Sequence, residues 1–132
     1  MELHLKIIGV LLIALALVHV IFPKYFHWKK ELNMLSLINK EMMQVHTLFI
    51  AITVLLIGFL CFTSANEIVT TNLGKRISLG LGIFWGIRLI IQLFGYSSKL
   101  WKGKIFETAV HILFSMLWFY LTWVFMSIYL NL

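Results

Sequence analysis

Four long runs of hydrophobic residues follow one another along this chain of 132 residues, with short polar segments between them. The runs cover residues 3–22, 43–62, 74–94 and 105–130. Each has about the 20 residues with which a helix crosses a hydrocarbon core of roughly 30 Å. The runs are continuous rather than alternating, which indicates helices, and helices satisfy their own backbone polar groups inside lipid. We therefore predict an all-α fold: a single-domain integral membrane four-helix bundle with short loops.

The first hydrophobic run resembles a signal peptide at its start, because Lys6 precedes a long apolar stretch. The run is followed by Phe22, Pro23 and Lys24, which offer no small-x-small cleavage site. We therefore predict that this segment is a retained helix.

The distribution of basic residues predicts the orientation of the bundle. Loops on the cytoplasmic side of a membrane carry an excess of lysine and arginine. The first and third connecting segments hold most of the basic residues: Lys24, Lys29, Lys30, Lys40, Lys99, Lys102 and Lys104. The opposite side has only Lys6, Lys75 and Arg76. We therefore predict a multi-pass membrane protein with the first and third connecting segments in the cytoplasm and both termini outside. Since the lysines flank spans instead of forming a basic face, no nucleic-acid partner is indicated.

Five polar residues lie inside the hydrophobic runs at a common depth near the predicted cytoplasmic side. Polar groups inside a bilayer are costly, and they suggest a functional site when they gather at one level. The group consists of His19, His46, Arg88, Gln92 and His111. At 1.5 Å per residue, all lie roughly 3–9 Å inside the boundary of their run. We therefore expect their side chains to converge in one intramembrane site.

Helical spacing places these polar residues on defined faces. Trp85, Arg88 and Gln92 are spaced i, i+3, i+7, which puts them on one side of the third helix. The fourth helix has a polar and aromatic stripe that contains His111 and Trp118. Purely structural roles stay open: a histidine near a helix end is often only hydrogen-bonded, and Arg88 could pair with Glu107.

Three kinds of ligand fit such a site. The first is haem b, with two histidines as axial ligands and Arg88 on a propionate. The second is zinc or iron held by His19, His46 and His111, with Glu107 as a fourth ligand or an acid–base group, as in a metal-dependent membrane enzyme. The third is a lipid, a quinone or a small anion, as in a transporter or accessory subunit. Haem b is the preferred prediction, and whether the protein is an enzyme stays open.

Two further features of the sequence leave alternatives. Gly82 and Gly86 form a GxxxG pair, which permits close helix packing either within the bundle or in a homo-oligomer. The first connecting segment has apolar residues at helical spacing up to Met42, which indicates an interfacial helix or an extension of the second span.

A single cysteine, Cys61, excludes a disulfide framework and a CxxC redox pair.

Residues 84–94, FWGIRLIIQLF, and residues 100–111, LWKGKIFETAVH, resemble a group of small bacterial integral membrane proteins with four helices. That group is similar in having an aromatic pair, an arginine and a glutamine on the third helix and a histidine on the fourth. The resemblance covers about the last two-thirds of the chain. It implies a small bacterial membrane protein and no particular activity.

Overall fold

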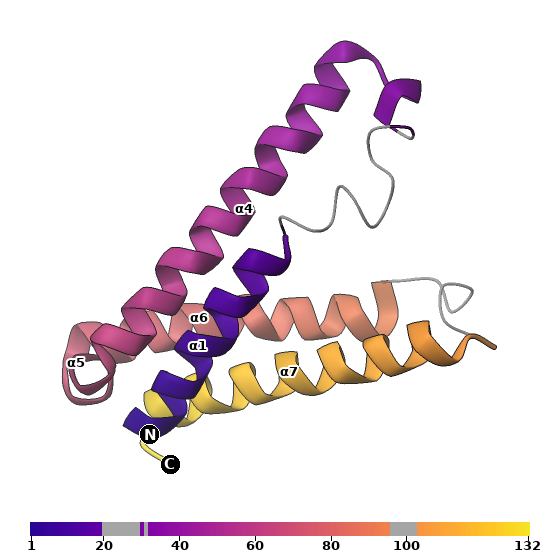
Figure 1. Ribbon diagram of the computed structural model, residues 1–132. Coiled ribbons are helices and arrows are strands. Elements are labelled where there is room, and N and C mark those ends of the chain that lie inside the picture. The colour runs from indigo at the N-terminus through magenta and orange to yellow at the C-terminus, as the bar shows by residue number, and fades with distance from the viewer. Residues whose placement is uncertain (20–29, 31, 96–102) are drawn as a thin grey trace. The chain divides into compact units, whose positions relative to one another are not determined.

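The computed structural model describes residues 1–19, 30, 32–95 and 103–132, and all regular structure in these ranges is helical (Figure 1). The chain forms two compact units, residues 2–65 and residues 66–132. Each unit is built around one pair of antiparallel helices, and each is described by itself below.

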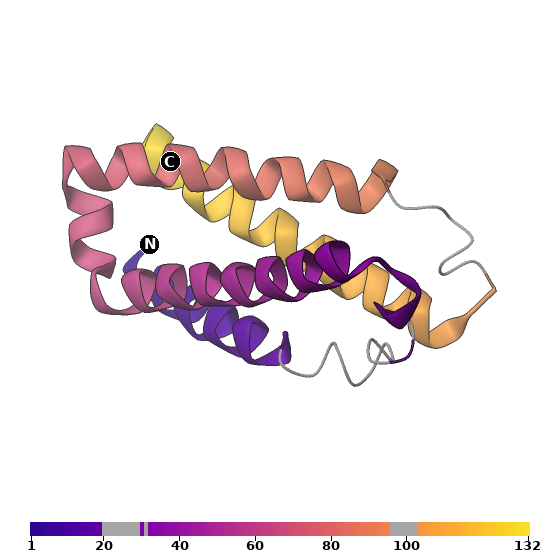
Figure 2. The ribbon, with the colours of Figure 1, turned by 90° about the horizontal axis from the view of Figure 1, so that it is seen from above.

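The first unit pairs α1 (Glu2–Val18) with α4 (Leu37–Thr63), and a short 3-10 helix, η1 (Leu32–Met34), precedes α4. The two helices run side by side in both views (Figures 1 and 2). The buried residues of α1 recur at helical spacing and form one apolar stripe: Leu5, Ile8, Gly9, Leu12 and Ala16. Ser36 begins α4, because its side chain accepts a hydrogen bond from the backbone N–H of Asn39.

Gly9 and Gly58 bring the backbones of α1 and α4 into direct contact. A Cβ atom on Gly9 would lie 2.7 Å from the carbonyl oxygen of Gly58 and 2.9 Å from the backbone nitrogen of Phe62. A Cβ atom on Gly58 would lie 2.9 Å from the carbonyl oxygen of Gly9. The lack of side chains at both positions therefore allows the two helices to pack this closely.

The second unit begins with a short helix, α5 (Ala65–Thr70), followed by α6 (Asn72–Ile90), a π-helical turn η2 (Ile91–Gly95) and α7 (Ile105–Leu130). Thr71 links α5 to α6. Its hydroxyl donates to the carbonyl of Glu67 at 2.7 Å and accepts from the N–H of Gly74 at 2.9 Å. One side chain thus ends α5 and begins α6.

Helices α6 and α7 pack against each other along their length. A Cβ atom on Gly82 would lie 2.6 Å from the sulfur of Met126, and one on Gly86 would lie 3.6 Å from the Thr122 methyl carbon. The GxxxG pair therefore packs within the unit, as one of the two alternatives predicted. A role of the same glycines in a homo-oligomer stays a prediction.

Three of the described helical segments are long and apolar enough to cross a membrane: Leu37–Thr63, Asn72–Gly95 and Ile105–Leu130. Many of their large apolar side chains are exposed; Phe94, for example, is 81% exposed and Ile105 91%. Apolar exposure on this scale is typical of proteins that face lipid. The all-helical prediction is confirmed for the described residues.

The helix bounds agree with the hydrophobic runs in most places. The fourth run, residues 105–130, coincides with α7, and the third falls within α6 and η2. Helix α4 begins at Leu37, so residues 37–42 continue the helix of the second hydrophobic run, as in one of the two alternatives predicted. The first run was expected to continue to residue 22; α1 ends at Val18, and residues 20–22 lie outside the described part of the chain.

Candidate functional site

Five side chains of the second unit form a polar and aromatic cluster between α6 and α7. This Gln92 cluster consists of Trp85, Arg88, Gln92, His111 and Trp118. The first three lie on successive turns of α6 and η2, and the last two are seven residues apart on α7, so each helix contributes one face. The structure thus brings together three of the five residues expected to converge.

Gln92 is the centre of the cluster. It lies in the π-helical turn η2 and is only 7% exposed. Its side-chain nitrogen is 2.8 Å from Nδ1 of His111, and its side-chain oxygen accepts a hydrogen bond from Nε1 of Trp118 at 3.4 Å. π-helical turns inside membrane-length helices often occur at functional positions.

The two hydrogen bonds of Gln92 are compatible with one neutral tautomer of His111. The indole N–H of Trp118 can only donate, so it requires the oxygen of Gln92 as its acceptor. The amide nitrogen of Gln92 then faces His111 and donates to Nδ1. Since Nδ1 accepts, the proton of the neutral imidazole lies on Nε2.

Trp118 also makes the aromatic contacts of the cluster. Its ring stacks on Trp85 with 5.0 Å between centroids and 6° between planes, and on Phe114 at 5.6 Å and 22°. The guanidinium carbon of Arg88 lies 5.2 Å from the Trp118 ring centroid, within the range of a cation–π interaction. These contacts fix the position of the only cation in the cluster.

The indole N–H of Trp85 is a further donor in this layer. Trp85 is 3% exposed, and within the described ranges its Nε1 atom is buried with no hydrogen-bond partner. A buried N–H group without an acceptor costs about 1–3 kcal/mol. The buried Trp85 N–H is thus a group of the cluster that can donate a hydrogen bond to a ligand.

Glu107 lies in the first turn of α7 and is exposed. An acidic residue there interacts favourably with the helix dipole, which is a structural explanation for its position. Both its predicted pairing with Arg88 and its predicted role as a metal ligand stay predictions.

The two remaining histidines belong to the first unit. Nδ1 of His19 lies 2.8 Å from the carbonyl oxygen of Leu15, one turn earlier in the chain. His46 is exposed on α4. Their convergence with the Gln92 cluster stays a prediction.

Metal ligation has no structural support beyond the sequence. Within residues 1–19, 30, 32–95 and 103–132, no three His, Cys, Asp or Glu side chains are grouped as metal ligands would be. The zinc or iron site of His19, His46, His111 and Glu107 therefore stays a prediction from the sequence.

Trp85 and Trp118 were not predicted as members of the site. Both were on the correct helix faces in the sequence, but tryptophan in a membrane-length helix is usually part of the apolar packing. The signal that could have identified them is their spacing from the polar residues: Trp85 is seven residues before Gln92, and Trp118 seven after His111.

Comparison of the chain with family models, curated proteins and solved structures gave no match. The function therefore has to be inferred from the chemistry of the site.

Proposed function

We propose that this chain is a four-span integral membrane protein whose Gln92 cluster binds a ligand through oxygen atoms of that ligand. Three helices have the length and apolar surface for a membrane, and α1, with 17 residues, extends for about 26 Å at 1.5 Å per residue. That length approaches the roughly 30 Å hydrocarbon core, which supports a fourth span.

The main support for this proposal is the pair of hydrogen bonds that link Trp118 to Gln92 and Gln92 to His111. These bonds leave His111 with a proton on Nε2 and with Nδ1 occupied by Gln92. A haem iron or a zinc ion needs a nitrogen lone pair, whereas a carbonyl, carboxylate or phosphate oxygen needs a donor. The arrangement thus favours a lipid, quinone or small anion over haem b and over a metal.

The other two donors support the same class of ligand. Arg88 is permanently charged and offers a planar set of N–H groups that matches carboxylate and phosphate oxygens. The Trp85 N–H is buried and can only donate. The Gln92 cluster is therefore complementary to a ligand rich in acceptors.

Purification followed by spectroscopy, metal analysis and mass spectrometry of an organic extract tests this proposal. We expect a colourless protein without stoichiometric zinc or iron, and one oxygen-bearing molecule in the extract. That molecule should be lost from His111→Ala and retained by Gln44→Leu, which changes an exposed residue of α4. A Soret band that disappears in His111→Ala would establish haem b instead, and bound metal would establish the metal site.

We also propose the predicted location, a bacterial inner membrane with both termini outside and the first and third connecting segments in the cytoplasm. The lysine asymmetry supports it. Single cysteines placed at Ser64 and at Met34 in a Cys61→Ala background test it in intact cells. Met34 is 89% exposed, so access of the reagent depends only on the side of the membrane. We expect a membrane-impermeant maleimide to label position 64 only; labelling at position 34 alone would invert the orientation.

A further inference from the structure

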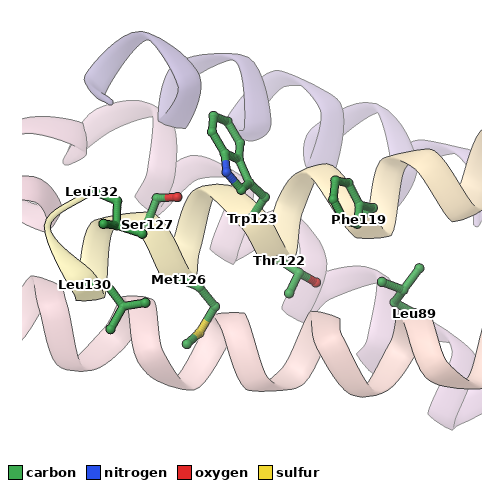
Figure 3. Close-up of a pocket in the computed structure, with 8 residues that line it drawn as sticks. All are labelled: Leu89, Phe119, Thr122, Trp123, Met126, Ser127, Leu130 and Leu132. Atoms are coloured by element: carbon green, nitrogen blue, oxygen red, sulfur yellow. The ribbon is translucent and has the colours of Figure 1, made fainter.

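A groove of about 250 Å³ runs along α7 toward its C-terminal end (Figure 3). The residues of α7 that line it recur at helical spacing and form one stripe: Phe119, Thr122, Trp123, Met126, Ser127 and Leu130. Leu89 of α6 lies at one end and Leu132 at the other. None of these lining residues belongs to the Gln92 cluster, so this α7 pocket is a separate feature of the second unit.

Two glycines of α6 border the α7 pocket. Figure 3 shows Thr122 and Met126 pointing from α7 toward α6. A Cβ atom on Gly82 would lie 2.6 Å from the Met126 sulfur, and one on Gly86 would lie 3.6 Å from the Thr122 methyl carbon. These lining side chains thus lie against bare backbone of α6, and among the described lining residues only Leu89 comes from that helix.

The wall of the α7 pocket is apolar. Aliphatic, aromatic and thioether groups make up most of it. The hydroxyl of Thr122 donates to the carbonyl oxygen of Trp118 at 2.8 Å, so it is satisfied within its own helix. An occupant of the pocket therefore meets mainly carbon and sulfur, which suits the van der Waals packing of a hydrocarbon chain.

The width of the α7 pocket fits one hydrocarbon chain. From Phe119 to Leu130 is 11 residues, which is about 16 Å at 1.5 Å per residue. A volume of about 250 Å³ over that length gives a cross-section of roughly 16 Å². An α-helix with its side chains is about 10–12 Å wide, which is roughly 80 Å² or more. A helix of a second copy or of another protein is therefore too wide to lie in the pocket. The length matches an acyl chain, which spans half of a roughly 30 Å hydrocarbon core.

A basic residue lies at the outer end of the α7 pocket. Lys75 precedes Gly82 by seven residues, and Gly86 and Leu89 follow at intervals of four and three, which places all of them on one side of α6. Since α6 and α7 are antiparallel, Lys75 lies about 10 Å beyond Gly82 toward the end of the pocket that Leu132 lines. Lys75 is half-buried, and among the described residues its ammonium group forms no ion pair. A lysine there can lay its stem along the helix and hold its charge at the membrane surface.

We infer that the α7 pocket binds one acyl chain of an anionic phospholipid whose phosphate lies at Lys75. A narrow apolar groove with a cation at its outer end is complementary to a molecule that joins a hydrocarbon chain to a negative head group. This inference goes beyond the proposed function. It requires the membrane span, but neither Arg88 nor His111 takes part in it.

Native mass spectrometry of the whole protein released from lipid nanodiscs tests the charge at the end of the pocket. The probe is phosphatidylglycerol in a phosphatidylcholine background. We expect the wild type to retain one phosphatidylglycerol and Lys75→Gln to retain about fivefold less, the effect of one basic group near a membrane surface. Arg76→Gln removes the same charge from the next residue, which is exposed on another face of α6, and should retain the lipid as the wild type does. Equal retention by the wild type and Lys75→Gln would overturn the inference.

A substitution in the pocket tests the acyl chain independently of the charge. Leu89→Trp adds bulk at the inner end of the α7 pocket, and Ile87→Trp adds the same bulk at a position of α6 that is 53% exposed. We expect retention of phosphatidylglycerol to fall in Leu89→Trp only, and equal retention by the two variants would contradict the inference. Circular dichroism before release checks that both are folded. Leu130→Trp, in the wall near the outer end, makes the same test if Leu89→Trp does not fold.

The variant His111→Ala separates this inference from the proposed function. It should lose the ligand of the Gln92 cluster and retain phosphatidylglycerol as the wild type does, because the phospholipid is a second molecule at a different site. Loss of phosphatidylglycerol from folded His111→Ala would place the lipid at the cluster and overturn the inference. A lipid-free dimer in the spectrum of the wild type would show a second copy over the pocket; it would also overturn the inference and leave the proposed function standing.

Discussion

The two helix pairs of this protein both use glycine to bring helices together, but they differ in what fills the rest of the contact. In the pair of α1 and α4, the backbones meet at Gly9 and Gly58, and the buried stripe of α1 is entirely apolar. In the pair of α6 and α7, Gly82 and Gly86 account for only part of the contact, and the Gln92 cluster occupies the end near η2.

The contact of α1 with α4 serves packing alone, whereas the contact of α6 with α7 also contains polar groups that could bind a ligand. An apolar contact between two helices in lipid gains from close van der Waals packing and needs no hydrogen bond. Polar side chains in lipid are costly unless they form hydrogen bonds. A layer of such side chains between two helices therefore suggests a functional role. Substitutions in α1 and α4 should therefore change stability, whereas substitutions in the Gln92 cluster should change the ligand as well.

The largest effect is expected at the glycine contact of the first pair. Gly9→Leu places a side chain against the backbone of Gly58 and Phe62, which cannot move aside without separating the helices. We expect a loss of about 3 kcal/mol or more, at or beyond the usual range for overpacking. Thermal unfolding in detergent, followed by circular dichroism, measures it.

Gly80→Leu is the matched control for that substitution. A Cβ atom on Gly80 would meet nothing within 4 Å, so the added side chain has open space. Removing a helical glycine there should leave stability unchanged or raise it by roughly 0.5–1 kcal/mol. Equal destabilisation by both variants would contradict the account of the first pair as a close backbone contact.

A smaller loss of stability is expected when Gln92, the central residue of the polar cluster between α6 and α7, is replaced. Gln92→Leu removes both hydrogen bonds of Gln92 and leaves the buried Trp118 N–H without its acceptor. We expect a loss of about 1–2 kcal/mol, since such bonds in membrane proteins are worth less than the full cost of an unsatisfied group. Near-UV circular dichroism of the stacked tryptophans during heating reports on this layer directly.

Gln44→Leu makes the same change in the first pair, at an exposed position of α4. A substitution of this kind should stay within about 0.5 kcal/mol of the wild type. The proposed ligand should be lost from Gln92→Leu and retained by Gln44→Leu. If both glutamine variants behaved alike, the contrast between the two helix pairs would fail.

The helices could be predicted from the sequence because long apolar runs leave few alternatives to a helix in lipid. The 105–130 run coincides with α7 for this reason. The short helix α5 was missed, because six residues are too few to show a clear apolar period and the helix ends at the hydroxyl of Thr71. Local hydrogen bonding of this kind does not appear in a hydrophobicity pattern.

The candidate site was predicted in part. The contact of Gln92 with His111 was expected, because both lie near the same end of consecutive helices in the sequence. The π-helical turn that carries Gln92, the stack of Trp85 on Trp118 and the resulting tautomer of His111 depend on side-chain geometry. Helical spacing places residues on a face, but it cannot tell which of them donates and which accepts.

The smallest effect is expected from Trp118→Phe, which removes the hydrogen-bond donor of Trp118 and keeps an aromatic ring at this position. The substitution keeps an aromatic ring in the stack and removes the one N–H that holds the oxygen of Gln92 in place. Gln92 is then free to turn, so His111 can carry its proton on either nitrogen. The loss of stability should be about 1–1.5 kcal/mol, because the buried position loses a hydrogen bond and some ring volume. Nitrogen-15 NMR of histidine-labelled protein, assigned with His111→Asn, should show only the Nε2–H form in the wild type and in Trp123→Phe, and a mixture of both tautomers in Trp118→Phe. A wild type with its proton on Nδ1 would leave Nε2 with a lone pair, and it would return the Gln92 cluster to haem b or a metal.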